Sequence, residues 1–254
     1  MLSSYCDETG HAKDPAKSHL GLAGILANSN AWEQFDQSWK YICREEGVCE
    51  PFHMTDFAAF QGQFADNHWK NEDKRRKLIG RYLDAIESAG GIPVGAIIDI
   101  PAFNSLTQDQ RSRLGGDKME PYYVAFQWVT RELAFASALT DWPPEKVSMV
   151  YAKLKKFTGV AEELWIGMKE QTYLGNFMSS YARGEPADYT PLQAADLWAY
   201  ELGHHFHRII PEHRKWRYPF TRFVQMGMNA SQGHKFFEYF DRARLLGCLG
   251  EFDE

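Results

Sequence analysis

Two apolar runs separated by a polar turn open the chain. Residues 1–7 are mostly small or apolar, residues 19–27 form a second apolar run, and the segment between them is rich in turn-forming residues. This pattern predicts a β-hairpin. Residues 31–46 then place large apolar side chains at helical spacing and are followed by Gly47, which predicts an amphipathic helix directly after the hairpin.

Strand-like and helix-like patterns alternate through the rest of the chain. Apolar composition predicts buried strands over 91–100 and 147–152, and helical spacing predicts helices over 71–88, 119–139, 159–170 and 190–208. The last of these begins with Thr190 as a cap and has Pro191 just inside it, as helix starts often do. Residues 101–117 are polar and carry glycines, so we expect a surface loop there.

A hairpin followed by alternating strands and helices is typical of an α/β protein with a mixed sheet flanked by helices. The later strands are expected to run parallel to the first strand. No internal repeat, low-complexity tract or linker divides the chain. We therefore expect one domain over residues 1–254, with a helical extension at about 209–254.

Composition narrows the functional classes. The chain has 254 residues, of which 44% are hydrophobic and 15% aromatic, so a large core is expected rather than disorder. Its net charge of −6 predicts that any polyanion is held locally and not by the whole surface. The 4 cysteines show no metal-type spacing, and no signal peptide or apolar run long enough for a membrane span is visible, so we expect a cytoplasmic protein without a membrane partner.

Acidic residues follow two of the expected strands. Asp7 and Glu8 come where the first strand ends, and Asp99 ends the strand at 91–100. The carboxyl ends of parallel strands share one edge of a sheet, which is where open α/β sheets bind ligands. Acidic side chains gathered there repel one another unless a cation is bound. The alternative is that Asp7 and Glu8 only serve a turn.

The helix at 190–208 carries a further acid. Gln193 and Asp196 lie three residues apart on the face that also bears its apolar residues, so Asp196 is expected to be buried and to need a partner. A salt bridge would satisfy it equally well. Taken together, Asp7, Asp99 and Asp196 suit Mg²⁺ or Mn²⁺ ions that activate water and stabilise a leaving oxygen, with Glu8 as ligand or base and Gln193 orienting the site.

Three short stretches carry a family resemblance. SYCDETG, FHMTDF and PLQAADLWAYE, in this order, resemble the signature stretches of the family called domain of unknown function 3800, which has a ribonuclease H-like fold. The resemblance covers residues 3 to about 208. It implies that Asp7 and Glu8 match the acidic pair on the first strand, that His53 matches the Phe-His motif, and that Gln193 and Asp196 match the motif on the late helix.

One position departs from the family pattern. The family usually has an aspartate at the end of the strand that corresponds to 147–152, whereas this chain has Ala152. Three readings stay open: a natural variant whose metal site depends on Asp99, a deliberately inactivated form, or an alignment error. Restoring an aspartate at 152 is expected to strengthen divalent-metal binding.

Histidines and basic residues give weaker signals. His53 has apolar neighbours, so a structural role is the more common case, although an imidazole there would suit the protonation of a leaving oxygen. The triplet His204, His205 and His207 is not expected to bind zinc, because adjacent helical residues point in different directions. Basic residues that could contact nucleic acid, together with one aromatic residue that could stack on a base, are Lys153, Lys155, Lys156, Arg214, Lys215, Trp216 and Arg217.

The sequence therefore favours a metal-dependent nuclease that hydrolyses the phosphodiester bonds of RNA or DNA. One alternative is a catalytically inactive module of the same fold that binds nucleic acid or protein, for which Ala152 is the main argument. Another is a metal-dependent hydrolase of a small nucleotide, which would need a closed pocket.

Overall fold

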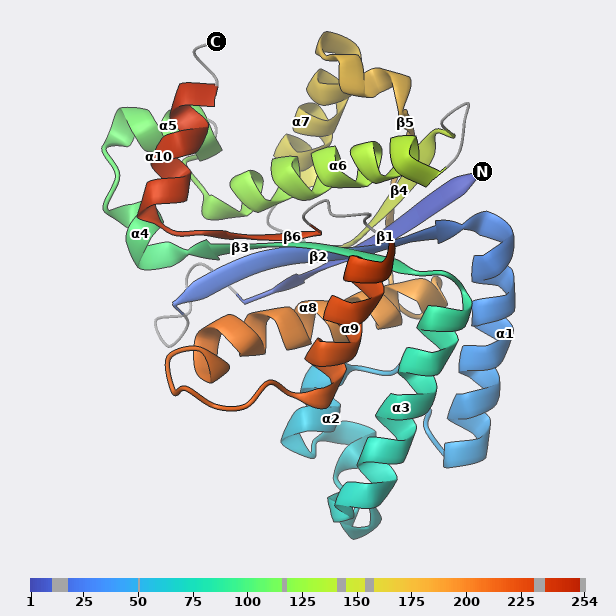
Figure 1. Cartoon of the computed structure of the whole chain (residues 1–254). Coiled ribbons are helices and arrows are strands. Elements are labelled where there is room, and N and C mark those ends of the chain that lie inside the picture. The colour runs from blue at the N-terminus through green and yellow to red at the C-terminus, as the bar shows by residue number, and fades with distance from the viewer. Residues whose placement is uncertain are drawn as a thin grey trace.

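A computed structural model describes residues 1–10, 18–49, 51–115, 118–140, 145–153, 158–230 and 236–251. Its centre is a six-stranded mixed sheet covered by helices on both faces (Figure 1). The α/β class and the helix-flanked mixed sheet predicted from the sequence are confirmed.

The sheet contains a hairpin and four further strands. The strands are β1 (Leu2–Thr9), β2 (His19–Asn28), β3 (Ile92–Asp99), β4 (Val147–Ala152), β5 (Met178–Gly184) and β6 (Phe237–Phe240). They lie in the order β5-β4-β1-β2-β3-β6, and β2 alone runs opposite to the other five. The predicted hairpin and the parallel direction of the later strands are confirmed.

Helices form a layer on each side of the sheet (Figure 1). One layer contains α5 (Gln108–Gly115), α6 (Pro121–Thr140), α7 (Thr158–Gln171) and α10 (Arg242–Glu251), and short α4 (Ile100–Asn104) follows β3. The other layer contains α1 (Ser29–Glu46), α2 (Met54–Ala59), α3 (Glu72–Ser88), α8 (Thr190–His204) and α9 (Tyr218–Ala230). Single turns lie at Gly62–Phe64, Asn67–Lys70 and Tyr173–Asn176, and a π-helical turn, His205–Ile209, extends α8.

Local sequence signals explain where these elements end. The side chain of Asn28 accepts a hydrogen bond from the Asn30 N–H at the start of α1, and Gly47 ends that helix in the left-handed conformation, with φ of 69°. Along β1, Cys6 packs in the core under α6, whereas its neighbour Tyr5 packs in the core under α8. Side chains alternate between the faces of a strand, so Asp7 faces the α8 layer.

Close packing brings α8 down onto the hairpin. Gly203 lies directly against the side chain of Thr9, and a Cβ atom at this position would overlap Thr9 Oγ1. Trp198, one of the largest fully buried side chains, donates from Nε1 to the carbonyl oxygen of Val94 in β3 at 3.0 Å. Helix α8 is thereby fixed against β1, β2 and β3.

Two regions differ from the sequence expectation. Of the segment 101–117, residues 116 and 117 lie outside the described residues, and 101–115 do not form a simple loop. Helices α4 and α5 lie there, and Phe103, Leu106 and Leu114 are buried although their neighbours are polar. The C-terminal region is not purely helical, because β6 joins the sheet beside β3. A strand of four residues is too short to produce a clear alternating pattern.

Two further properties concern membrane spans and disulfides. Among the described residues, no helix is both long and apolar enough to cross a membrane. The four cysteines all lie within the described residues, and none of them forms a disulfide.

Candidate functional site

Asp7 places a carboxylate at the end of β1, under α8. Its side chain is buried, and Oδ1 accepts a hydrogen bond of 2.9 Å from the Glu8 N–H. Burial raises the pKa of Asp7 well above its usual value, and the negative charges of Glu8 and Asp196 raise it further. The first strand therefore presents a carboxyl group that is costly to ionise alone.

Asp196 brings a second buried carboxylate to the same place from α8. Its pKa is raised to about 6, chiefly by burial and less strongly by Glu8 and Asp56, whereas His53 and a hydrogen bond from the Met54 N–H oppose the rise. Within the described residues, no lysine or arginine forms an ion pair with Asp7 or Asp196. The structure thus brings Asp7, Glu8 and Asp196 together, as the sequence predicts.

His53 lies beside Asp196, in an extended segment just before α2. Its Nδ1 is 3.6 Å from Asp196 Oδ2, and half of its side chain is exposed, with a relative accessibility of 50%. The backbone N–H groups on either side of it are both bound to α8: Phe52 donates to Gln193 Oε1 at 2.8 Å, and Met54 donates to Asp196 Oδ2 at 2.6 Å. Helix α8 therefore holds the His53 segment against Asp7 and Asp196, which are called the acidic pair from here on.

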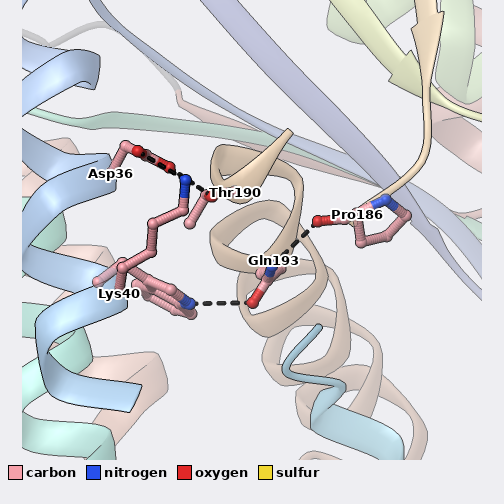
Figure 2. Close-up of polar contacts among 6 residues, drawn as sticks. Asp36, Lys40, Pro186, Thr190 and Gln193 are labelled. Atoms are coloured by element: carbon pink, nitrogen blue, oxygen red, sulfur yellow. Dashed lines mark hydrogen bonds and ion pairs between the residues drawn. The ribbon is translucent and has the colours of Figure 1, made fainter. Parts of the chain in front are cut away.

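Gln193 uses its amide for structure and not for the carboxylates. Besides the bond from Phe52, its Oε1 accepts from Trp39 Nε1 of α1 at 2.9 Å, and its Nε2 donates to the Pro186 carbonyl oxygen at 2.9 Å (Figure 2). Next to it, Thr190 Oγ1 donates to Asp36 Oδ1 of α1 at 2.5 Å. Gln193 acts on the site by fixing α8, α1 and the His53 segment together.

We expect Gln193→Leu to lower the free energy of unfolding by about 2–4 kcal/mol. The substitution leaves the buried Trp39 and Phe52 N–H groups without acceptors, and each buried unsatisfied group costs about 1–3 kcal/mol. Urea denaturation measures the loss. Gln37→Leu, at an exposed position of α1, is the control and should change stability by less than about 0.5 kcal/mol. Equal stability of the two variants would contradict this role.

Asp99 does not join the acidic pair, so its assignment as a metal ligand beside Asp7 and Asp196 is corrected. Asp7 is level with Gly95 across the hairpin, and Asp99 lies four residues further along β3. At about 3.3 Å per residue and about 4.8 Å per strand, this separates the two backbones by roughly 16 Å. Asp99 instead accepts hydrogen bonds from the Ala102 N–H at 2.9 Å and from the Tyr239 hydroxyl at 3.1 Å. Strand β3 ends at the same edge of the sheet as β1, but Asp99 lies too far from Asp7 along that edge to share a metal ion with it.

Asp99 belongs to a separate network of polar side chains. Tyr239 OH is 3.3 Å from His19 Nε2, and Ser18 Oγ lies 2.8 Å from His19 Nδ1 and 3.2 Å from His207 Nδ1. The three histidines of the 204–207 segment accordingly diverge. His207 belongs to this network through Ser18, His204 stacks on Tyr200, and His205 stacks on Phe220 with ring centroids 3.8 Å apart.

Ala152 lies next to Asp7. Cys6 is paired with Tyr151 in the parallel β1–β4 ladder, so the following residues, Asp7 and Ala152, are neighbours. Cys6 and Tyr151 share the core under α6, which places Asp7 and Ala152 on the opposite face, toward α8. The position at which the resemblance implies an aspartate is therefore the one closest to Asp7 on the adjacent strand.

The basic residues predicted to bind nucleic acid have separate surroundings. Lys153 forms an ion pair with Glu185 at 3.6 Å, and Arg214 forms one with Glu212 at 2.5 Å. Trp216 is exposed, with a relative accessibility of 56%, and Lys215 is also exposed. Arg217 is partly buried and pairs with Glu201. Lys155 and Lys156 lie outside the described residues.

The donor atoms at the acidic pair fit a hard divalent cation. Mg²⁺ is commonly held by one or two carboxylates while it keeps several waters or substrate oxygens, and Asp7 and Asp196 supply two carboxylates. Across the described ranges, no three His, Cys, Asp or Glu side chains are arranged to hold a metal ion together. The site thus offers two protein ligands, with Glu8 nearby and Ala152 in the place where a third would lie.

Sequence patterns missed two residues close to this site. Arg75 lies in the basic run KRRK at residues 74–77 of α3, and Tyr200 lies in the PLQAADLWAYE stretch, but neither pattern indicates a role for the individual residue. Tyr200 lies four residues after Asp196, so helical spacing alone could have placed it on the same face of α8. Nothing in the sequence indicates that Arg75 lies near it.

Comparisons with known proteins add no relative. No protein-family model matches the chain, and a search of curated proteins finds no significantly similar sequence. The resemblance to the domain of unknown function 3800 family stays a prediction that rests on its three short stretches.

Proposed function

We propose that this protein is a divalent-metal-dependent nuclease whose centre is the pair Asp7 and Asp196. The observation that carries the proposal is the burial of these two carboxylates, from a strand and from a distant helix, without a lysine or arginine partner among the described residues. Two like charges in a poorly solvated place repel each other strongly, and a bound divalent cation removes that cost. Mg²⁺ or Mn²⁺ is the cofactor that their oxygen ligands favour.

When bound, the metal would activate water and stabilise the charge on a phosphodiester. Asp7 and Asp196 would hold it, and Glu8, whose charge acts on both carboxyl groups, would assist as a base. His53 is half exposed and anchored on both sides by α8, so its imidazole can reach a substrate while its backbone stays fixed. An imidazole there suits the protonation of the leaving oxygen.

The arrangement of the sheet supports the ribonuclease H-like part of the proposal. An N-terminal hairpin is followed by strands parallel to the first, and the motif residues of β1, of the His53 segment and of α8 meet in one place. Residues 7, 53 and 196 are far apart in sequence, so their convergence is not a trivial result of proximity along the chain.

We expect the protein to cleave labelled RNA or DNA oligonucleotides in millimolar Mn²⁺ or Mg²⁺ and to lose this activity in EDTA. The reason is that two buried carboxylates cannot replace the charge that the ion supplies to the phosphodiester. Product formation is followed on denaturing gels. Asp241→Asn, at an exposed acid near β6, is the control and should leave cleavage unchanged. Cleavage that is unaffected by EDTA would contradict the proposal.

The second candidate is a module of the same fold that binds nucleic acid without cleaving it. Ala152 favours this candidate, because the residue beside Asp7 on β4 has no side-chain oxygen. Binding to an oligonucleotide in EDTA, without cleavage in either metal, would support the module over the nuclease.

A further inference from the structure

A cluster of positive charge lies one helical turn from the acidic pair. Tyr200 follows Asp196 by four residues, or about 6 Å along the axis of α8. The Arg217 guanidinium carbon is 5.6 Å from the centre of the Tyr200 ring, and Arg217 also pairs with the buried Glu201 at 3.0 Å. Glu201 thereby fixes a guanidinium group beside the Tyr200 ring.

Arg75 brings a second guanidinium group to this place from α3. Its guanidinium carbon lies 4.2 Å from the centre of the Phe57 ring and 4.1 Å from that of Phe60. Its Nη1 is buried and has no hydrogen-bond partner, and within the described part of the chain no carboxylate pairs with it. The side chain is held by two aromatic rings, yet its charge is not neutralised.

The two guanidinium groups repel each other. Helix α2, whose Phe57 ring lies against Arg75, packs on α8, which carries Tyr200 beside Arg217, so the two guanidinium groups lie on either side of this helix contact. In agreement with this, burial lowers the pKa of Arg75 and the positive charge of Arg217 lowers it further. Tyr200 acts in the opposite sense and raises the pKa of Arg75. Arg217 has a carboxylate partner in Glu201, and Arg75 has none among the described residues, so the two fixed guanidinium groups keep an excess of positive charge. Such a place suits a phosphate, which accepts several hydrogen bonds from arginine.

We propose that Arg75 and Arg217, together with Tyr200, bind the phosphate that neighbours the cleaved phosphodiester in a single-stranded nucleic acid. This inference rests on the proposed function for the identity of its ligand, but the subsite itself stands on the geometry of the arginines. The distance of one helical turn from Asp196 suits the spacing of successive phosphates along a strand.

Aromatic rings and further arginines around the subsite favour nucleic acid over a small phosphorylated molecule. The rings of Tyr200 and His204 are stacked with centroids 5.8 Å apart, and Arg208 and Arg214 are close enough to act on His204. Rings interleaved with cations bind single strands, because unstacked bases lie on the rings while the phosphates contact the cations. An extended anionic ligand would contact all of these rings and arginines, whereas free phosphate would contact only Arg75 and Arg217.

The test measures binding separately from cleavage. Fluorescence anisotropy of labelled single-stranded RNA and DNA is recorded in EDTA over a series of salt concentrations for the wild type, Arg75→Gln and Arg76→Gln. Arg76 is the matched control, since it is the next residue of α3, is exposed and pairs with Glu72. We expect Arg75→Gln to weaken binding about tenfold and to reduce the salt slope by about 0.7, the value for one lost phosphate contact on a single strand. Arg76→Gln should match the wild type.

Further arms separate the sources of phosphate and the effect of folding. A duplex should bind more weakly than the single strands, and millimolar inorganic phosphate should compete poorly with the oligonucleotide. Arg75→Lys, which keeps the charge, should retain part of the binding, and circular dichroism with thermal unfolding checks that each variant is folded.

The outcomes distinguish this inference from the proposed function. Equal binding by folded Arg75→Gln and Arg76→Gln, or competition by free phosphate as effective as that by the oligonucleotide, would overturn the subsite. Loss of binding in Arg75→Gln supports it even if no cleavage is found in Mn²⁺, in which case the nuclease proposal alone fails.

Discussion

Asp7→Asn is expected to reduce metal-dependent cleavage by about a hundredfold or more, while making the metal-free protein more stable. A catalytic metal contributes several kcal/mol to the transition state, and each 1.4 kcal/mol or so changes the rate about tenfold. The same substitution removes a buried carboxylate that repels Glu8 and Asp196, as its raised pKa indicates. Because burial and these neighbouring charges make the ionised form of Asp7 costly in the folded protein, the free energy of unfolding in EDTA should rise.

Cleavage rates in Mn²⁺ and urea denaturation in EDTA measure the two effects of Asp7→Asn. Asn keeps the size of the side chain and can still accept from the Glu8 N–H, so the fold is preserved. Asp84→Asn, at a distant acid of α3 that pairs with Arg222, provides a charge-matched control whose cleavage rate should not change. A variant that cleaves normally would show that the acidic pair is not the catalytic centre, whatever its stability.

Ala152→Asp is expected to strengthen Mn²⁺ binding by about ten- to a hundredfold. The new carboxylate would extend from β4 on the same face as Asp7, one strand away, and the affinity of an oxygen site rises steeply with the number of its charged ligands. Without metal, a third acid in this place should lower stability, since it adds another repelling charge. Isothermal titration calorimetry with Mn²⁺ measures the change in affinity.

The control for this gain is Ala152→Asn, which has nearly the same size but no charge. It should bind Mn²⁺ with about the affinity of the wild type. If Ala152→Asp and the wild type bound Mn²⁺ equally, position 152 would have no part in the site, and the family resemblance would lose its implied third acid.

Most of the fold could be predicted because its signals are local. The periodic apolar residues of α1, α3 and α6 and the apolar runs of β1 to β4 were visible in the sequence, and α8 was marked by Thr190 and Pro191 at its start. By contrast, α4 and α5 were hidden, since single buried residues such as Phe103 and Leu114 are scattered in a polar segment. Packing against α6 and α10, and not propensity, stabilises that region.

The site residues that belong to sequence motifs could be predicted, whereas those whose position depends on strand register could not. Asp7, His53 and Asp196 were found from their motifs, and the structure brings them together. Asp99 looked equivalent to Asp7 because each ends a strand. The pairing of β2 with β3, however, carries Asp99 past the end of β1, and strand register cannot be determined from an isolated sequence.

The distance between the carboxyl groups of Asp7 and Asp196 depends on Gly203, a residue without a side chain. Contact with Thr9 is made by the bare backbone of α8, two turns beyond Asp196. Any side chain at position 203 would overlap Thr9 and push this end of α8 away from β1. The helix would tilt about its first turn, because Thr190 and Gln193 bind that turn to α1. The tilt would widen the gap between two carboxyl groups that a single ion must span, so the width of that gap is set from the far end of the helix.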